Sequence, residues 1–300
     1  NLMTLDKFME GDKAVNGSEY VLRISTPECN LLCNYCRIED HFDVDPIEQE
    51  EVLDIIKASV ECGIKRLRWT GGEPTVTPNF LDMVSKSKDY GIESQMLSTN
   101  GTILYNIAEK LYKAGINGVN ISLDTLDKKV FKEITGKDWL SRVLQSINVA
   151  TDIFDIVKLN CVLEKSTAEE IKSFIDYIDT YKSKKTLPVI RFIELIKGGF
   201  EGDVEYVKDN QFSGEDLVQI VREKYGNLTN TEFEGDNPMC RYYKIDDNGI
   251  IFGIIPHFSI NFQCGGKRCK KLRLNPTGYI SNCSIHKEFS HNLKDTSYEE

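Results

Sequence analysis

Two groups of cysteines have the spacing of metal ligands. The first is Cys29, Cys33 and Cys36, in the pattern C-x3-C-x2-C directly after an apolar run. Three thiolates on one short loop can hold three irons of a 4Fe–4S cluster, which leaves the fourth iron open to an exchangeable ligand. A zinc site completed by His41, or three unrelated buried thiols, are the alternatives. An open iron predicts an enzyme, because that iron can bind a reactant.

The second group is Cys264, Cys269 and Cys283, near the end of the chain. It again supplies three thiolates, so a second open cluster is one interpretation. A zinc knuckle completed by His257 or His286 is the alternative that the spacing leaves open.

Alternating strand-like and helix-like stretches must position these cysteines. Strand-like runs begin near Tyr20, Arg66, Glu93, Gly118, Val157 and Val189. Helix-like stretches lie between them, such as Glu51 to Glu61, whose predicted buried face is Val52, Ile55, Ile56 and Val60. Repeats of about 30 residues predict a parallel sheet with right-handed crossovers. Six such units are fewer than a closed barrel needs, so we expect an α/β fold, a partial (β/α)6 barrel of the TIM type.

After about residue 200 the pattern changes, and we expect a C-terminal α+β module there. It contains one helix, Ser213 to Lys224, and two hairpin strands, Arg241 to Asp246 and Gly249 to Pro256, joined by an Asp-Asn-Gly turn. This module carries the second cysteine group and is the candidate cover for the open side of the barrel. The expected domains are 1–200, the partial barrel, and 201–300, the module with the second iron–sulfur cluster.

Composition and charge exclude some classes of protein. The chain has 300 residues and a formal net charge of −10, which argues against a general nucleic-acid-binding surface but not against a small basic pocket. The longest apolar run, Gly249 to Pro256, is far too short to span a bilayer, and Leu2 to Val15 shows no signal peptide, so a cytoplasmic location is expected. Cys62 and Cys161 lack ligand spacing and are predicted to be buried apolar residues, and Cys240 has no assigned role.

A glycine-rich loop, Trp69 to Pro74, follows the second strand-like run and reads Trp-Thr-Gly-Gly-Glu-Pro. Its glycines permit close backbone approach, and the Glu73 carboxylate is a candidate acceptor for an ammonium group. The loop lies one strand after the first cysteine group. In sequence and in position it resembles the GGEP motif of the radical S-adenosylmethionine (SAM) superfamily. The resemblance implies that SAM chelates the open iron and is cleaved to a 5′-deoxyadenosyl radical.

Over most of its length the chain is similar to the GTP 3′,8-cyclases of molybdenum cofactor biosynthesis. The similar segments are Leu22–Ser25, Lys65–Pro74, Ser98–Gly101, Asn120–Asp124, Lys158–Asn160, Ile190–Glu194, Tyr242–Phe252 and Cys269–Cys283. The resemblance implies a lyase that cyclises GTP, with SAM and two 4Fe–4S clusters as cofactors. It places Tyr35, Gly71, Gly72, Glu73, Ser122 and Ile196 at the SAM site. It places Arg23, Arg68, Ser98, Lys158, Lys271 and Arg273 against GTP, and Arg191 and Arg23 are the catalytic candidates.

The charges of the chain agree with an anionic substrate. Arg23, Arg68, Lys158 and Arg191 lie in strand-like runs whose ends meet in a barrel mouth, where a triphosphate is a suitable counter-charge. Lys271 and Arg273 are two residues apart and would share one face of a strand.

Some features depart from the cyclase pattern. The second cysteine group begins C-x4-C, where the family shows C-x2-C. Lys271 stands where an arginine is usual, and Ile196 stands where a methionine is usual. The printed sequence shows no Gly-Gly tail, which the cyclases have. The alternatives are a paralogue acting on another nucleotide or on a peptide, and a non-catalytic metal-binding protein. The expected partners are a nucleotide, first of all GTP, and an electron donor such as flavodoxin or ferredoxin. A homodimer is left open, and no DNA, RNA or membrane is expected.

Overall fold

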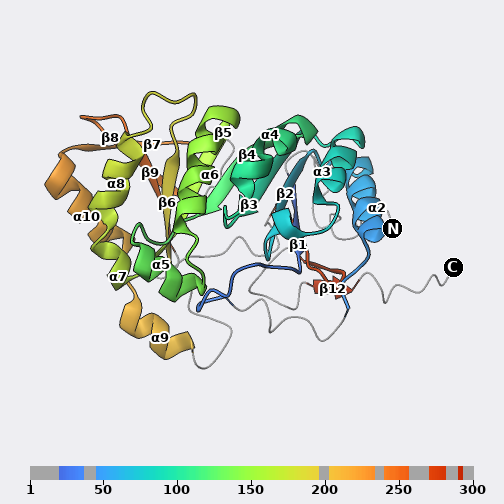
Figure 1. Ribbon diagram of the computed structural model, residues 1–300, viewed down its shortest axis with the longest axis horizontal. Helices are drawn as coiled ribbons and strands as arrows, with labels where there is room; N and C mark the ends of the chain where they lie inside the picture. The colour runs from blue at the N-terminus through green and yellow to red at the C-terminus, as the bar shows by residue number, and fades with distance from the viewer. Residues whose placement is uncertain are drawn as a thin grey trace. The chain divides into compact units, whose positions relative to one another are not determined.

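The computed structural model describes residues 20–36, 45–195, 203–233, 240–256, 270–281 and 290–292 (Figure 1). In its first part the elements are β1 (Val21–Thr26), α2 (Gln49–Glu61), β2 (Arg66–Gly71), η3 (Pro74–Val76), α3 (Phe80–Asp89), β3 (Ser94–Thr99), α4 (Leu104–Ala114), β4 (Ile116–Ser122), α5 (Lys128–Thr135) and α6 (Leu140–Ile153). They continue as β5 (Ile156–Leu163), α7 (Lys165–Ala168), α8 (Ile171–Asp179), β6 (Val189–Glu194), α9 (Asp203–Asn210), α10 (Gly214–Tyr225), β7 (Leu228–Thr231), β8 (Arg241–Ile245), β9 (Ile251–Ile255), β10 (Lys271–Leu274), β11 (Tyr279–Ser281) and β12 (Ser290–Asn292).

The predicted α/β architecture is confirmed. Strands β1 to β6 begin at, or within two residues of, the positions that the sequence predicts. The described strands follow the order β12-β11-β10-β1-β2-β3-β4-β5-β6-β9-β8-β7, in which β12 and β7 are the end strands. The sheet that these strands form is therefore open, as expected of a partial barrel.

Two compact units divide the chain, and strand β4 contributes to both. The first consists of 1–99, 106–119 and 264–300, and the second of 100–105 and 120–263. In the first, β10 pairs parallel to β1, and β11 and β12 follow antiparallel. In the second, β9 pairs parallel to β6, and β8 and β7 follow antiparallel. The C-terminal strands thus extend the sheet, a pairing that the sequence pattern does not predict. The domain boundary near residue 200 stays a prediction.

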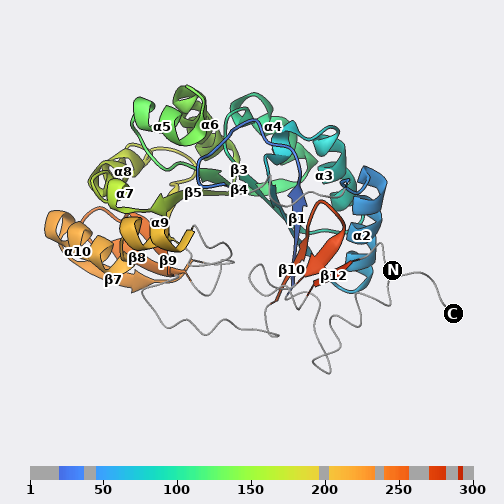
Figure 2. The same ribbon diagram turned by 90° about the horizontal axis from the view of Figure 1, so that it is seen from below.

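Helices cover one face of the strands in the first unit, which leaves the other face for polar residues. Figure 2 shows α2 and α3 on one side of β1. The Trp69 ring of β2 packs edge-on against Phe80 of α3, with ring centroids 5.3 Å apart. Side chains alternate along a strand, so Arg68 and Thr70, the neighbours of Trp69, lie on the opposite face. Leu22 and Leu67 are buried on the helix-covered face.

Helix α2 begins earlier than predicted, and its buried face agrees only in part with the predicted one. Glu48 and Glu51 form a reciprocal capping box at its N-terminus, which starts the helix at Gln49. Its buried apolar residues include Leu53 and Ile56, whereas Val52, Ile55 and Val60 are only half-buried. The prediction is confirmed for Ile56 and wrong for the other three residues, because a run of aliphatic residues matches more than one helical stripe.

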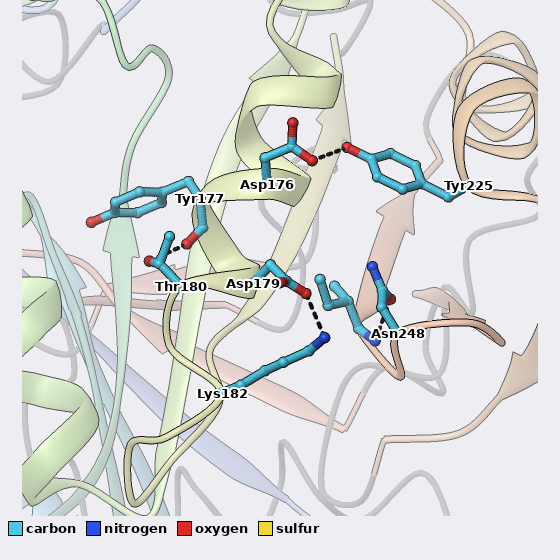
Figure 3. Close-up of polar contacts among 8 residues, drawn as sticks. Asp176, Tyr177, Asp179, Thr180, Lys182, Tyr225 and Asn248 are labelled. Atoms are coloured by element: carbon cyan, nitrogen blue, oxygen red, sulfur yellow. Dashed lines mark hydrogen bonds and ion pairs between the residues drawn. The ribbon is translucent and has the colours of Figure 1, made fainter.

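Polar contacts join helices α8 and α10 in the second unit (Figure 3). The Tyr225 hydroxyl donates to Asp176 Oδ1 at 2.6 Å, as Figure 3 shows. Lys224 Nζ lies 2.6 Å from Asp176 Oδ2. Helix α10 was predicted at Ser213 to Lys224, and Ser213 is in fact its N-cap. The predicted β8–β9 hairpin turn is confirmed, with Gly249 at a φ of 77°. None of the helices in the described ranges combines the length and apolarity needed to cross a membrane.

The contact between α8 and α10 predicts a pH-dependent stability. Hydrogen bonds from Lys224 and Tyr225 lower the pKa of Asp176. A carboxyl with a lowered folded-state pKa adds stability above its unfolded pKa, and that stability is lost as the pH falls through the folded value. We expect Asp176→Asn to reduce the free energy of unfolding at pH 7 by less than about 1 kcal/mol, because the carboxylate is largely exposed. In thermal unfolding, the difference from wild type should shrink towards pH 3. An equal difference at both pH values would contradict the assignment.

Candidate functional site

The first cysteine group lies in the loop that follows β1. Cys29 and Cys36 are exposed, Cys33 is half-buried, and the Cys36 N–H donates to the Cys33 carbonyl at 2.9 Å, which closes a turn. Partial burial raises the pKa of the Cys29 thiol, and the charges of Glu73 and Cys36 act in the same direction. Positively charged irons would favour the thiolates in such a group.

The donor set of the cysteine loop fits a 4Fe–4S cluster, because each of its three thiolates can bind a different iron. Among the described residues, no three His, Cys, Asp or Glu side chains form a ready-made site for one metal ion. His41, which the zinc alternative requires, lies outside the described residues.

The glycine-rich loop is bonded to the chain that leads into the cysteine loop. The Gly72 N–H donates to the Thr26 carbonyl at 2.8 Å, and the Glu73 N–H donates to the Glu28 carbonyl at 2.6 Å. A Cβ on Gly71 would lie 2.3 Å from Thr26 N, and one on Gly72 would lie 2.0 Å from the Glu28 carbonyl oxygen. Only glycine permits this approach, so both glycines fix the cysteine loop relative to the end of β2.

We expect Gly72→Ala to separate these two loops. The added methyl group cannot fit without moving the Glu28 backbone, so iron retention after reconstitution and SAM affinity should both fall by about tenfold or more. Equilibrium dialysis with SAM and iron analysis measure the two effects. Gly226→Ala is the control, because its φ of 80° strains alanine while the nearest atom is 3.5 Å away. Equal losses in both variants would show that only general stability is affected.

Glu73 is fully buried and already holds its own loop in place. Its Oε1 accepts hydrogen bonds from the Thr75 N–H at 3.1 Å, the Thr75 hydroxyl at 2.5 Å and the Thr99 hydroxyl at 2.7 Å. These contacts tie the glycine-rich loop to the end of β3. A further contact from Glu73 to the SAM ammonium stays a prediction.

Arginines from three adjacent strands form a row in the first unit. Arg23 of β1 is in register with Arg273 of β10 on one side and with Arg68 of β2 on the other. All three lie on the face opposite the buried leucines of their strands. Neighbouring strands are about 4.8 Å apart, so three like charges are close together. Such a row favours a bound anion.

Sequence reasoning missed a fourth arginine on this face. Arg66 lies two residues before Arg68 on β2, and Val21, its partner in register, also pairs with Lys271. The Nε atoms of Arg66, Arg68, Arg23 and Arg273 are all buried. The period of two along a strand was the signal that could have identified Arg66. The predicted Ser98 shares this face, because it lies two residues after Met96, the register partner of Arg68.

The predicted cations of the second unit lie on β5 and β6. Lys158 is 1% exposed, and its Nζ lies 4.8 Å from the centre of the Phe233 ring. Arg191 is 3% exposed and is in register with Asn160, which follows Lys158 by two residues on the same face of β5. Ser122 is exposed at the end of β4. A buried lysine and a buried arginine on one face mark a polar interior.

Other predicted residues have varied outcomes. Ile196, Cys264, Cys269, Cys283, His257 and His286 lie outside the described residues. Tyr35, in the cysteine loop, is 38% exposed. Cys161 is buried as predicted, whereas Cys62 is only half-buried, at the end of α2.

A cavity of about 580 Å³ lies on the helix-covered face of the first unit. Ile24, Trp69 and Val52 are among the residues that line it, and none of the predicted site residues does.

Comparison with known proteins agrees with the geometry of this site. Residues 24–178 match the sequence model of the radical SAM superfamily. Over 270 residues the chain is 34% identical to the probable GTP 3′,8-cyclase of Pyrococcus horikoshii, covering 89% of this chain and 84% of that protein. The chain belongs to the GTP 3′,8-cyclase family of radical SAM enzymes. The GTP 3′,8-cyclase of Aliarcobacter butzleri is also 34% identical over 270 residues, covering 87% of this chain and 79% of that cyclase.

Solved structures show the same fold. The crystal structure of Streptococcus suis SuiB bound to S-adenosylmethionine matches with a TM-score of 0.63 and 14% identity, covering 93% of this chain and 64% of that one. As a member of the GTP 3′,8-cyclase family, the chain is an enzyme with SAM and a 4Fe–4S cluster as cofactors.

Proposed function

We propose that this enzyme cyclises GTP by joining C3′ of the ribose to C8 of the guanine, as the names of its relatives state for them. The observation that carries the proposal is the row of Arg273, Arg23 and Arg68. Its central strand, β1, leads directly into the cysteine loop, so the anion site and the cluster site share one strand. A triphosphate is the part of GTP that such a row would bind.

The residues of the cysteine loop and glycine-rich loop would hold the cofactors. Cys29, Cys33 and Cys36 would bind three irons. Tyr35, Gly71, Gly72, Glu73, Ser122 and Ile196 are the proposed contacts of SAM. When bound, the cluster and SAM supply 5′-deoxyadenosyl radical chemistry, which removes a hydrogen atom from the ribose. The chain contributes orientation and electrostatic stabilisation around that chemistry.

Cations and one hydroxyl would orient the nucleotide. Arg23, Arg68, Ser98, Lys158, Lys271 and Arg273 are the proposed substrate contacts, and Arg66 joins them because it shares their face of β2. Arg191 and Arg23 are the proposed catalytic residues. Burial of Lys158 and Arg191 strengthens their interaction with a bound anion, because the local dielectric is lower than in water.

Cys264, Cys269 and Cys283 are proposed to hold a second 4Fe–4S cluster beside the guanine. The anaerobically reconstituted enzyme should then contain about eight irons per chain, and replacement of these cysteines by alanine should leave about four. Iron and sulfide analysis measures both values. A zinc ion in the wild type, with about four irons, would contradict the second cluster.

The decisive experiment is an anaerobic incubation with SAM, a strong reductant and a panel of nucleoside triphosphates. We expect GTP to stimulate 5′-deoxyadenosine formation and to yield a nucleotide isomer, both detected by mass spectrometry. SAM cleavage with unchanged GTP would move the substrate to another nucleotide or a peptide. An electron donor such as flavodoxin or ferredoxin, a cytoplasmic location and a homodimer remain part of this proposal.

A further inference from the structure

Arg191 is held by two asparagines of neighbouring strands. Its Nε and Nη2 donate to Asn160 Oδ1 of β5 at 3.0 Å and 2.6 Å. Its Nη2 also donates to Asn120 Oδ1 of β4 at 3.2 Å. Asn120 is 1% exposed and Arg191 is 3% exposed, so these contacts lie in the interior of the second unit. Hydrogen bonds in such surroundings are stronger than at the surface.

The strand on the other side of Arg191 presents no side chain at this level. Gly253 of β9 is its partner in register. A Cβ on Gly253 would lie 2.7 Å from Cys240 Sγ and 2.8 Å from the Tyr242 ring. Those two side chains therefore occupy the space over Gly253. The three hydrogen bonds to Asn160 and Asn120 reach Arg191 from β5 and β4.

The chemistry of the two acceptors matters as much as their position. A guanidinium is planar, so contacts along its Nε–Nη2 edge fix the plane of the whole group. A carboxylate could make the same contacts but would bring a negative charge beside the arginine. Amide oxygens accept the hydrogen bonds without that charge. The three contacts therefore orient the guanidinium through neutral acceptors.

We propose that Asn160 and Asn120 are positioning residues, which hold the Arg191 guanidinium in a fixed orientation for the reacting nucleotide. This inference rests on the proposed function for the step that Arg191 serves. The asparagines act through Arg191 and do not need to touch the nucleotide. Their replacement should affect the fate of the nucleotide after SAM cleavage more than SAM cleavage itself.

Asn160→Asp separates geometry from charge, because it keeps an acceptor at the same place and adds a negative charge. In the reconstituted enzyme we expect GTP-dependent 5′-deoxyadenosine formation to stay within about threefold of wild type. Cyclised nucleotide formed per 5′-deoxyadenosine should fall by about tenfold or more, the loss expected when a charged contact is weakened. Asn160→Leu, which removes the acceptor, should show the same uncoupling. Asn117→Asp is the matched control on β4, because Asn117 Oδ1 accepts a hydrogen bond from the Gln95 N–H instead, at 2.8 Å.

A spectroscopic measurement tests the positioning independently of catalysis. The Arg191 Nε–H signal, assigned by NMR through its loss in Arg191→Lys, should exchange slowly with water in wild type and quickly in Asn160→Leu. Equal exchange in both proteins, or wild-type coupling in both Asn160 variants, would overturn the proposal. Absence of any GTP product from wild type, with the expected change in exchange, would support the positioning of Arg191 and overturn only the GTP assignment.

Discussion

Replacing Cys33 with alanine should abolish reductive cleavage of SAM. A cluster with only two thiolates from its loop lacks a third protein ligand, and the iron that binds SAM is no longer held in a defined place. We expect 5′-deoxyadenosine formation to fall by more than about 100-fold, since changes around metal ligands already cost up to about that factor. Chromatography of 5′-deoxyadenosine measures the rate, and iron analysis shows the loss of the first cluster.

The control is Cys62→Ala, which removes a half-buried thiol at the end of α2. It should keep wild-type iron and wild-type SAM cleavage. If Cys33→Ala retained both, the loop after β1 would not hold the catalytic cluster, and the assignment of all three of its cysteines would be wrong.

Neutralising the central pair of the arginine row should weaken GTP binding most. Arg23 and Arg68 are neighbours in register, and a charge-assisted hydrogen bond contributes about 1.5–3 kcal/mol. Each single replacement, Arg23→Gln or Arg68→Gln, should therefore raise the Kd for GTP by about 10- to 100-fold. Raised salt should weaken GTP binding to wild type more than to the variants, because each variant has one fewer positive charge for the salt to screen.

The matched control is Arg142→Gln on α6, where the arginine lies over the Trp139 ring, 4.6 Å from its centre. It should leave GTP affinity unchanged. SAM cleavage in the absence of GTP should be the same in all these variants. Unchanged GTP affinity in both Arg23→Gln and Arg68→Gln would show that GTP does not bind to this face of the sheet.

The parts of the fold that the sequence predicts are those with local signals. Runs of β-branched and apolar residues locate β1 to β6, and the Asp-Asn-Gly turn locates the β8–β9 hairpin. The cysteine and glycine-rich loops are also local, because their residues are adjacent in sequence. Arg23 and Arg68 could be singled out because they lie in these predicted strands.

The parts that could not be predicted depend on contacts between distant segments. Nothing near Leu272 indicates that β10 pairs with β1, yet that pairing brings Arg273 beside Arg23. The contacts of Asn160 and Asn120 with Arg191 likewise join three separate strands. The buried face of α2 was predicted only in part, because several aliphatic residues compete for it and packing decides among them.

The most direct test of the central claim uses GTP labelled with deuterium at C3′. In an anaerobic reaction with SAM and reductant, the account predicts that deuterium appears in 5′-deoxyadenosine while GTP is converted to a cyclised isomer. Deuterium-free 5′-deoxyadenosine, formed while the labelled GTP remains unchanged, would contradict the claim that this radical SAM enzyme acts on the ribose of GTP.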